Sequence, residues 1–126
     1  MTPRFLILCG SLVLALGVAA GAFGAHGLRR LVSPELLETW RTAAHYQMIH
    51  GLGLLLIAAL WAWLAPRPAA WAGGLMLAGL LVFSGSLYAL VLTGIRTLGA
   101  VTPVGGLLMI ASWVVLFAAA WRGPAQ

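Results

Sequence analysis

The charged side chains of this chain are confined to its two ends and to three short gaps. Its seven arginines and two glutamates leave four uncharged stretches, at residues 5–28, 42–66, 68–95 and 97–121. A bilayer core about 30 Å thick is crossed by roughly 20 apolar residues in a helix, so each stretch is long enough for one crossing. A charge at the centre of a membrane helix costs about 2.5–3.5 kcal/mol, which explains why the charges gather in the gaps. The pattern predicts four transmembrane helices.

The composition excludes a soluble domain and argues against nucleic-acid binding. Of the 126 residues, 63% are hydrophobic and 7% are charged, whereas a small soluble domain buries only about two thirds of its chain surface. The formal net charge of +5 comes entirely from arginines. These arginines flank the predicted helices, where we expect them to meet anionic lipid headgroups. No basic patch with interleaved aromatic residues lies outside the uncharged stretches, as single-stranded nucleic-acid binding would require.

Proline and capping residues mark where the predicted helices begin. Ser33 and Pro34 are an N-cap and a first-turn proline, and they open an amphipathic segment at residues 33–41. No helix breaker follows this interfacial segment, so we expect it to lead directly into the second span. The prolines at residues 66–68 stop one helix and start the next, and Thr102 precedes a proline in the same way.

These signals predict an all-α integral membrane four-helix bundle. Because the connections are short, successive helices should be antiparallel neighbours in an up-down order. The short amphipathic segment precedes the second helix. We expect a single domain over residues 1–126, with spans at 5–28, 42–65, 69–94 and 102–121.

Small residues recur on the predicted helices at spacings that permit close packing. Lipid tails are as apolar as leucine, so close backbone contact, rather than a hydrophobic force, holds membrane helices together. Such residues serve packing within one chain or self-association, and we favour the first because four helices need several contact surfaces of their own. The predicted packing positions are Gly17, Gly21, Gly24, Gly74, Gly85, Gly105 and Gly106.

Polar residues gather in one half of the predicted bundle, because antiparallel helices bring the ends of the first and third spans beside the starts of the second and fourth. This polar cluster comprises His26, His45, Tyr46, Gln47, His50, Ser84, Ser86, Tyr88 and Thr102. One interpretation is a hydrogen-bonded contact that fixes helix register, at about 0.6 kcal/mol per bond. The other is a site for a small molecule, a lipid headgroup or an ion. We expect His50 to bond to a hydroxyl or carbonyl group of a neighbouring helix.

The sequence offers no catalytic set and no metal site. Its only acids, Glu35 and Glu38, lie in the amphipathic segment, and no nucleophile, base and orienting group occur together. His45 and His50 are five residues apart and so point roughly 140° away from each other on a helix. His26 and His50 could bracket a haem between two helices, but no acidic ligand or second-shell carboxylate accompanies them. We therefore predict no enzyme, no metal and no cofactor.

Four ordered motifs resemble a known family. They are GAFGAHG at 21–27, TAAHYQMIHG at 42–51, FSGSLYAL at 83–90 and TPVGG at 102–106. Together they resemble the uncharacterised family of small membrane proteins that includes transmembrane protein 256, a domain of unknown function. The resemblance covers nearly the whole chain and implies four transmembrane helices in the inner (plasma) membrane of a bacterium. It implies no activity. It also favours cytoplasmic termini, a choice that the arginine counts at the two membrane faces leave nearly balanced.

Three classes of function follow from these observations. We expect a non-catalytic accessory or interaction protein, whose partners are the lipid bilayer and other membrane proteins or further copies of itself. The alternative is an oligomer that binds or transports a small molecule, a lipid or an ion through the polar cluster. Against transport, no predicted span carries a carboxylate or an arginine to couple ion movement. The most remote alternative is a haem or metal redox protein.

Overall fold

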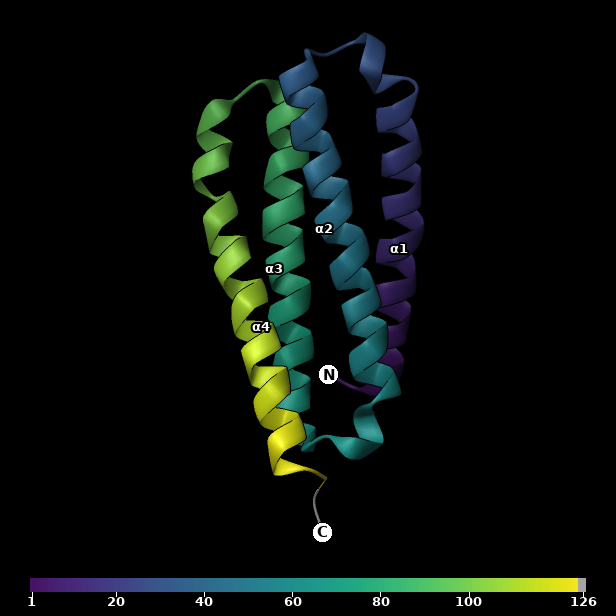
Figure 1. Cartoon of the computed structure of the whole chain (residues 1–126), viewed down its shortest axis with the longest axis vertical. Helices are drawn as coiled ribbons and strands as arrows, with labels where there is room; N and C mark the ends of the chain where they lie inside the picture. Colours follow the sequence, from purple (N-terminus) through teal and green to yellow (C-terminus); the bar gives the residue numbers. More distant parts are fainter. Residues whose placement is uncertain (125–126) are drawn as a thin grey trace.

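The computed structural model describes residues 1–124, which are helical almost throughout (Figure 1). The four long helices are α1 (Pro3–Ala25), α2 (Pro34–Ala59), α3 (Pro66–Thr93) and α4 (Thr102–Arg122). The three connections contain short 3-10 turns, η1 (Leu28–Arg30), η2 (Trp61–Trp63) and η3 (Arg96–Ala100). Within the described residues there is no strand, and the predicted all-α fold class is confirmed.

Each long helix carries a proline in its first turn. A proline fits there because the first turn has no intrahelical partner for a backbone N–H, and because its fixed φ suits the helix. The Thr2 hydroxyl accepts a hydrogen bond from the backbone N–H of Phe5 at 3.2 Å. At the start of α2 the Ser33 hydroxyl accepts one from Leu36 at 3.3 Å. The amphipathic segment that follows Ser33 is the first part of α2 and runs on without a break.

The second helix ends earlier than the sequence led us to expect. α2 stops at Ala59, whereas the expected span reached residue 65. Ala65 has the extended conformation, with φ −61° and ψ 122°, because a residue that precedes a proline disfavours the helical region. Its backbone N–H donates to the Ala119 carbonyl oxygen at 3.0 Å. The turn between α2 and α3 is thereby fastened to the end of α4.

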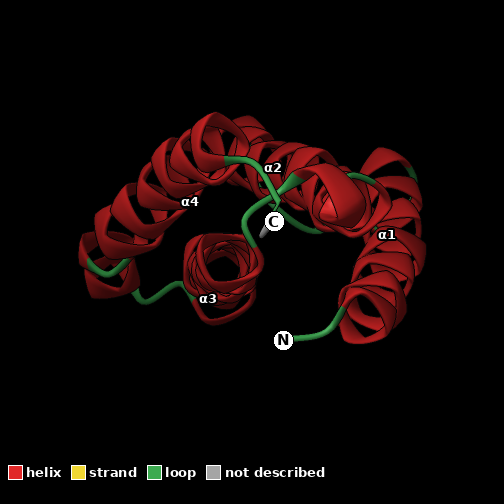
Figure 2. Ribbon diagram, turned by 90° about the horizontal axis from the view of Figure 1, so that it is seen from below, coloured by secondary structure: helices red, strands yellow, loops and turns green. Residues whose placement is uncertain are grey.

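The four helices run up and down, and they pack in chain order, α1 against α2, α2 against α3 and α3 against α4. Viewed along the bundle, α1 and α4 lie at opposite edges, and α3 lies inside the arc that α4, α2 and α1 form (Figure 2). The start of α1 and the end of α4 are at the same end of the bundle, the terminal end (Figure 1). The connections that contain η1 and η3 are at the other end, the loop end. In this arrangement α2 and α3 are the inner pair, and each packs extensively against two long helices.

Three helical segments are long and apolar enough to cross a membrane, at Pro3–Arg30, Pro66–Thr93 and Arg96–Arg122. α2 is not among them, because His45, Gln47 and His50 lower its mean hydropathy. α2 is also a helix with neighbours on both sides, so its buried polar side chains, Gln47 and His50, have other helices to bind. The polarity of α2 and its inner position are therefore consistent with each other.

The apolar core lies toward the end of the bundle that holds the termini. Leu6, Leu54, Ile57 and Met76 are fully buried there, one or two from each of the first three helices. Large apolar side chains also cover the outside of the helices, and Trp121 is 83% exposed. A water-soluble protein rarely exposes such a continuous apolar surface, whereas a membrane protein presents it to lipid.

A close backbone contact joins α3 to α4 at a predicted glycine. A Cβ atom on Gly105 would lie 2.7 Å from the Gly79 carbonyl oxygen and 2.8 Å from Phe83 Cα. Those distances are shorter than the roughly 3.5–4.0 Å of an optimal contact, and the atoms are backbone atoms that cannot rotate away. At Gly106 the same atom would lie 3.9 Å from the Phe83 ring, an ordinary contact. Backbone contact between α3 and α4 therefore depends on Gly105.

Two further predicted glycines lie where α1 meets α2. A Cβ atom on Gly17 would lie 2.6 Å from Met48 Sδ, and one on Gly24 would lie 2.7 Å from Trp40 Cδ1. Both glycines are buried. The large Met48 and Trp40 side chains therefore occupy the space that these glycines leave open on α1.

Three other predicted packing glycines do not make such contacts. A Cβ atom on Gly21 or Gly85 would have no heavy atom within 4 Å, and both residues are exposed. On Gly74 it would meet only Met1 Cε, at 3.7 Å, whereas on the neighbouring Gly73 it would meet Leu6 Cδ2 at 2.7 Å. The assignment of Gly21, Gly74 and Gly85 to contacts between helices of one chain is therefore wrong.

Candidate functional site

The side chain of Gln47 joins three helices. From α2, its Nε2 donates to the Val13 carbonyl oxygen of α1 at 2.8 Å. Its Oε1 accepts a hydrogen bond from the Tyr88 hydroxyl of α3 at 2.6 Å. The residue is 7% exposed, and an unpaired buried amide would cost about 1–3 kcal/mol. The two bonds therefore favour one register of α1, α2 and α3 over others.

Trp40 lies beside this link and closes it toward the loop end. Its indole Nε1 donates to the Ala20 carbonyl oxygen of α1 at 2.8 Å. Its ring centroid lies 4.5 Å from that of Tyr88 and 5.6 Å from that of Phe23. The indole therefore spans from α2 to both neighbouring helices. This position of the ring is open only because Gly24 has no side chain.

Three hydroxyl groups continue the polar contacts toward α4. Ser84 donates to the Ala43 carbonyl oxygen of α2 at 2.8 Å. Ser86 donates to the Phe83 carbonyl oxygen of its own helix at 3.0 Å. Ser86 and Thr102 are joined at 2.6 Å, from α3 to α4. Because the single Ser86 proton is used on Phe83, the Thr102 hydroxyl is the donor in that pair.

His50 of α2 is hydrogen-bonded at both ring nitrogens, and one of these bonds joins α2 to α4. Its Nδ1 lies 2.9 Å from the Tyr46 carbonyl oxygen, four residues earlier on the same helix. Its Nε2 accepts a hydrogen bond from the indole Nε1 of Trp113 at 3.1 Å. A carbonyl can only accept and an indole N–H can only donate, so these partners select the neutral tautomer that is protonated at Nδ1. The imidazole is 5% exposed.

The expected partner of His50 was therefore wrong. The carbonyl group that it binds belongs to its own helix, and the partner on a neighbouring helix is the indole of Trp113 rather than a hydroxyl or carbonyl group. The Tyr46 ring is stacked on the imidazole, with centroids 5.9 Å apart, and contacts the Phe83 ring at 4.6 Å. Both nitrogens of His50 are occupied, so His50 could bind a metal only by losing one of these two hydrogen bonds.

The polar cluster proposed from the sequence divides into separate contacts. Gln47 with Tyr88, Ser84 with Ala43, Ser86 with Thr102, and His50 with Trp113 are distinct hydrogen-bonded pairs. His26 and His45 are exposed and join none of them. The inward-pointing residues thus connect neighbouring helices pair by pair, and they do not converge on one point.

Sequence reasoning missed three polar side chains that bind across helices. Trp40 and Trp113 were not among the residues of the predicted polar cluster, although both donate a hydrogen bond to another helix. Ser112 is fully buried, and its hydroxyl donates to the Ala72 carbonyl oxygen of α3 at 2.6 Å. This bond lies outside the half of the bundle where polar residues were expected. A lone serine in an apolar run is the only signal that could have drawn attention to it.

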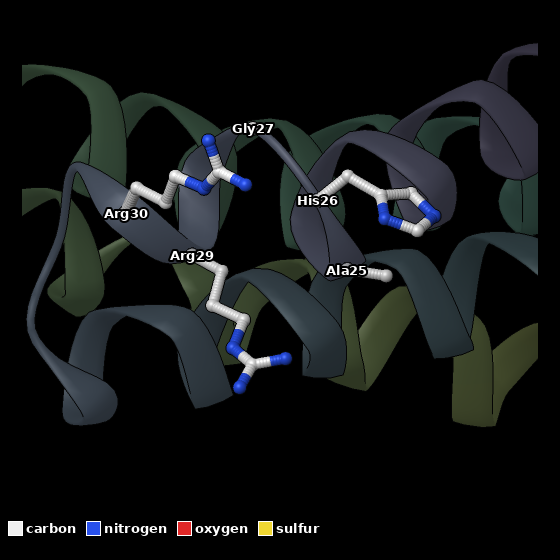
Figure 3. A pocket seen from close by; sticks show the side chains of 5 residues that line it. All are labelled: Ala25, His26, Gly27, Arg29 and Arg30. Atoms are coloured by element: carbon white, nitrogen blue, oxygen red, sulfur yellow. The ribbon is translucent and has the colours of Figure 1, made fainter.

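Two surface hollows lie near η1 and the start of α2. At the loop end, a hollow of about 590 Å³ is lined by residues 25–27 with Arg29 and Arg30. The side chains of Arg29 and Arg30 point to different sides of the turn, and the His26 ring points away from both (Figure 3). A second hollow, of about 290 Å³, lies on the exposed side of Tyr46 and is lined by Glu38, Arg41, Thr42 and His45. Arg41 and Glu38 are paired there at 3.7 Å.

Every buried side-chain nitrogen or oxygen in residues 1–124 has a hydrogen-bond partner. The same part of the chain brings together no group of three or more histidine, cysteine or acidic side chains. A buried polar group that lacks a partner is rare, and a catalytic or ion-binding role is one explanation for it. The interior polar groups of this bundle are instead used up in contacts between its own helices.

Comparison with known proteins places the chain in a family. Residues 20–106 match the family described as "Protein of unknown function (DUF423)". The chain belongs to this DUF423 family. The prediction of an uncharacterised family of small membrane proteins is confirmed. The matched region runs from the second half of α1 to the first turn of α4, and it contains all nine residues proposed for the polar cluster.

Bacterial relatives extend the similarity to almost the full length. The chain is 43% identical over 122 residues to UPF0382 membrane protein YwdK of Bacillus subtilis, which covers 93% of this chain and 96% of the relative. It is 44% identical over 119 residues to UPF0382 membrane protein SH2409 of Staphylococcus haemolyticus, with 94% and 97% covered. No solved structure matches the chain. The DUF423 chain is therefore a membrane protein of a family whose function is unknown.

Proposed function

We propose that this DUF423 protein is a non-catalytic accessory or interaction protein of the bacterial inner membrane. The observation that carries the proposal is the complete pairing of the buried polar side chains within residues 1–124. A catalytic or transport site needs polar groups that are free to engage a substrate. Here Gln47, Ser84 and His50 are each engaged with backbone or side-chain groups of the bundle.

The outer surface supports the same proposal. Gly21 and Gly85 are exposed, with open space where a side chain would be. A glycine on a lipid-facing helix surface allows the backbone of another helix to approach closely, which is a favourable contact in a bilayer. The partner would be another membrane protein or a further copy of this chain.

Site-specific photocrosslinking in living cells tests the proposal. A photoreactive amino acid at Gly21 or Gly85, in an affinity-tagged full chain, should yield a discrete crosslinked protein. The matched control carries the same amino acid at Leu12, which is 61% exposed on α1. If none of the three positions gives a protein adduct, and the tagged chain purifies alone from mild detergent, the accessory role is wrong.

A second candidate is binding or transport by an oligomer, and one observation favours it. The hollow beside Tyr46 combines Glu38, Arg41 and His45 with an aromatic wall at the membrane interface. Under this alternative the purified protein would form a stable oligomer that releases a trapped solute from vesicles. A monomer in detergent without solute release would exclude it, whereas an accessory role with another membrane protein as partner is compatible with that result.

We further propose that both termini face the cytoplasm. The termini lie at the same end of the bundle (Figure 1), so one measurement decides the orientation of both. A C-terminal alkaline phosphatase fusion should be inactive and a C-terminal green fluorescent protein fusion should be fluorescent. An active phosphatase fusion would reverse the assignment.

A further inference from the structure

A groove at the terminal end of the bundle lies between the start of α3 and the end of α4. It has a volume of about 400 Å³ and is lined by Arg67, Pro68, Trp71, Leu75, Val115, Ala118 and Arg122. It is separate from the buried polar contacts described above. Two arginines that are far apart in the sequence therefore border one groove.

On each wall of the groove an arginine lies at one end and apolar side chains follow it along the helix. On α3, Arg67, Trp71 and Leu75 follow one another at intervals of four residues, so they form one ridge along the helix. On α4, Val115 and Ala118 lead to Arg122 at helical spacings on the facing wall. Because α3 and α4 are antiparallel, both arginines are at the terminal end and the apolar residues lie deeper. The groove is thus cationic at its mouth and apolar along its length.

The charge at the mouth has no partner within residues 1–124. The only ion pair in that part of the chain joins Arg41 to Glu38, and both glutamates belong to the start of α2, at the opposite end of the bundle. Arg67 and Arg122 are exposed. By contrast, the arginines of the loop-end hollow diverge and come from one turn, η1 (Figure 3).

We propose that this groove binds one anionic glycerophospholipid, with the phosphate between Arg67 and Arg122 and an acyl chain along the apolar walls. Guanidinium groups bind phosphate through paired N–H donors. From Arg67 to Leu75 the α3 wall extends about 12 Å at 1.5 Å per residue. One leaflet of a bilayer core is about 15 Å deep. The groove therefore matches the part of a lipid that runs from the headgroup into the leaflet.

Lipid titration of the purified full chain in mild detergent tests the site, with bound lipid counted by native mass spectrometry. We expect phosphatidylglycerol to bind roughly 25-fold more tightly than phosphatidylcholine, since each arginine near an anionic headgroup contributes about fivefold. The double variant Arg67→Gln/Arg122→Gln should lose that preference. The matched control Arg29→Gln/Arg30→Gln removes the same charge from the other end and should keep it.

A second pair of variants tests the apolar part of the groove. Ala118→Trp would fill the groove, whereas Ala120→Trp places the same side chain on an exposed position of the same helix outside it. Only Ala118→Trp should weaken phosphatidylglycerol binding. Helix content from circular dichroism confirms that each variant is folded.

Three outcomes would overturn the inference. The first is equal binding of the two lipids, and the second is an unchanged preference in the Arg67→Gln/Arg122→Gln protein. The third is displacement of the lipid by an equal concentration of inorganic phosphate, with no effect of Ala118→Trp, which would identify a free anion as the occupant. The test uses the isolated protein, so it does not depend on whether the chain has a protein partner.

Discussion

Replacement of Gly105 by alanine should loosen the contact between α3 and α4. The added methyl would lie 2.7 Å from the Gly79 carbonyl oxygen and 2.8 Å from Phe83 Cα, about 1 Å closer than an optimal contact. Overpacking of this kind costs typically about 1–3 kcal/mol. The obstructing atoms are backbone atoms of α3, so α4 must move as a whole. We therefore expect the clash to lower the free energy of unfolding by about 2 kcal/mol.

The matched variant Gly106→Ala isolates this clash. Both glycines lie near the start of α4, so the gain in helix propensity from glycine to alanine, about 1 kcal/mol, is common to the two variants. At Gly106 the methyl would meet only the Phe83 ring, at 3.9 Å. The difference in stability between the two variants therefore reports the backbone contact alone.

Reversible unfolding in mixed detergent micelles, followed by tryptophan fluorescence, measures that difference. Gly105→Ala should unfold with an equilibrium constant roughly 30-fold larger than that of Gly106→Ala. Equal stabilities for the two variants would refute the reasoning, because α3 and α4 could not then be in backbone contact at this position.

Four further results are expected. Tyr88→Phe should lower the free energy of unfolding by about 1–2 kcal/mol, because it leaves the buried Gln47 oxygen unpaired, and the double variant with Gln47→Leu should cost less than the sum of the two single changes. Gly21→Leu should change stability by less than about 0.5 kcal/mol in monomeric protein, and a large loss would place Gly21 in a contact within the chain. Trp113→Phe should destabilise the protein by about 1 kcal/mol through the lost bond to His50, and the same loss in a His50→Phe background would deny that the two side chains interact. Purified protein that has been incubated with haem and then freed of unbound haem should show no Soret band, whereas a retained band that disappears in His50→Phe would revive the redox alternative.

Much of the fold could be predicted because a bilayer restricts what a chain can do. The gaps at Arg67 and Arg96 separate uncharged stretches, and a proline in the first turn marks each helix start. The early end of α2 was missed because Trp61–Trp63 are as compatible with a helix as with a turn. Only the hydrogen bond from the Ala65 backbone N–H to the Ala119 carbonyl oxygen shows where the chain reverses.

The packing glycines were predicted less well because the predicted set combined glycines four residues apart, such as Gly17 and Gly21, with glycines seven residues apart, such as Gly17 and Gly24. Steps of four residues advance about 40° beyond a full turn, so Gly17 and Gly21 drift apart around α1. Steps of seven residues drift by only about 20°. Gly10, Gly17 and Gly24 follow the seven-residue interval, and all three are buried.

The partners of the polar residues were the least predictable part. Gln47 was identified as an inward-facing residue, but its first partner is the carbonyl group of Val13. Every residue carries a carbonyl group, so no sequence pattern distinguishes the one that will be used. Trp113 was overlooked for a related reason, since an indole is mostly apolar surface with a single donor.

The inner position of α2 bears on how the protein enters the membrane during synthesis. α2 is the long helix that falls short of the apolarity of a membrane-crossing segment, and its amide and imidazole groups find partners on α1, α3 and α4. While the ribosome is still making α3, only the Val13 carbonyl oxygen is in place for Gln47. We therefore expect the insertion machinery to hold α1 and α2 as a hairpin until α3 emerges, rather than to release α2 singly into lipid. Chains arrested shortly after residue 65 should remain near the translocation channel, and chains that extend past α3 should partition into the bilayer.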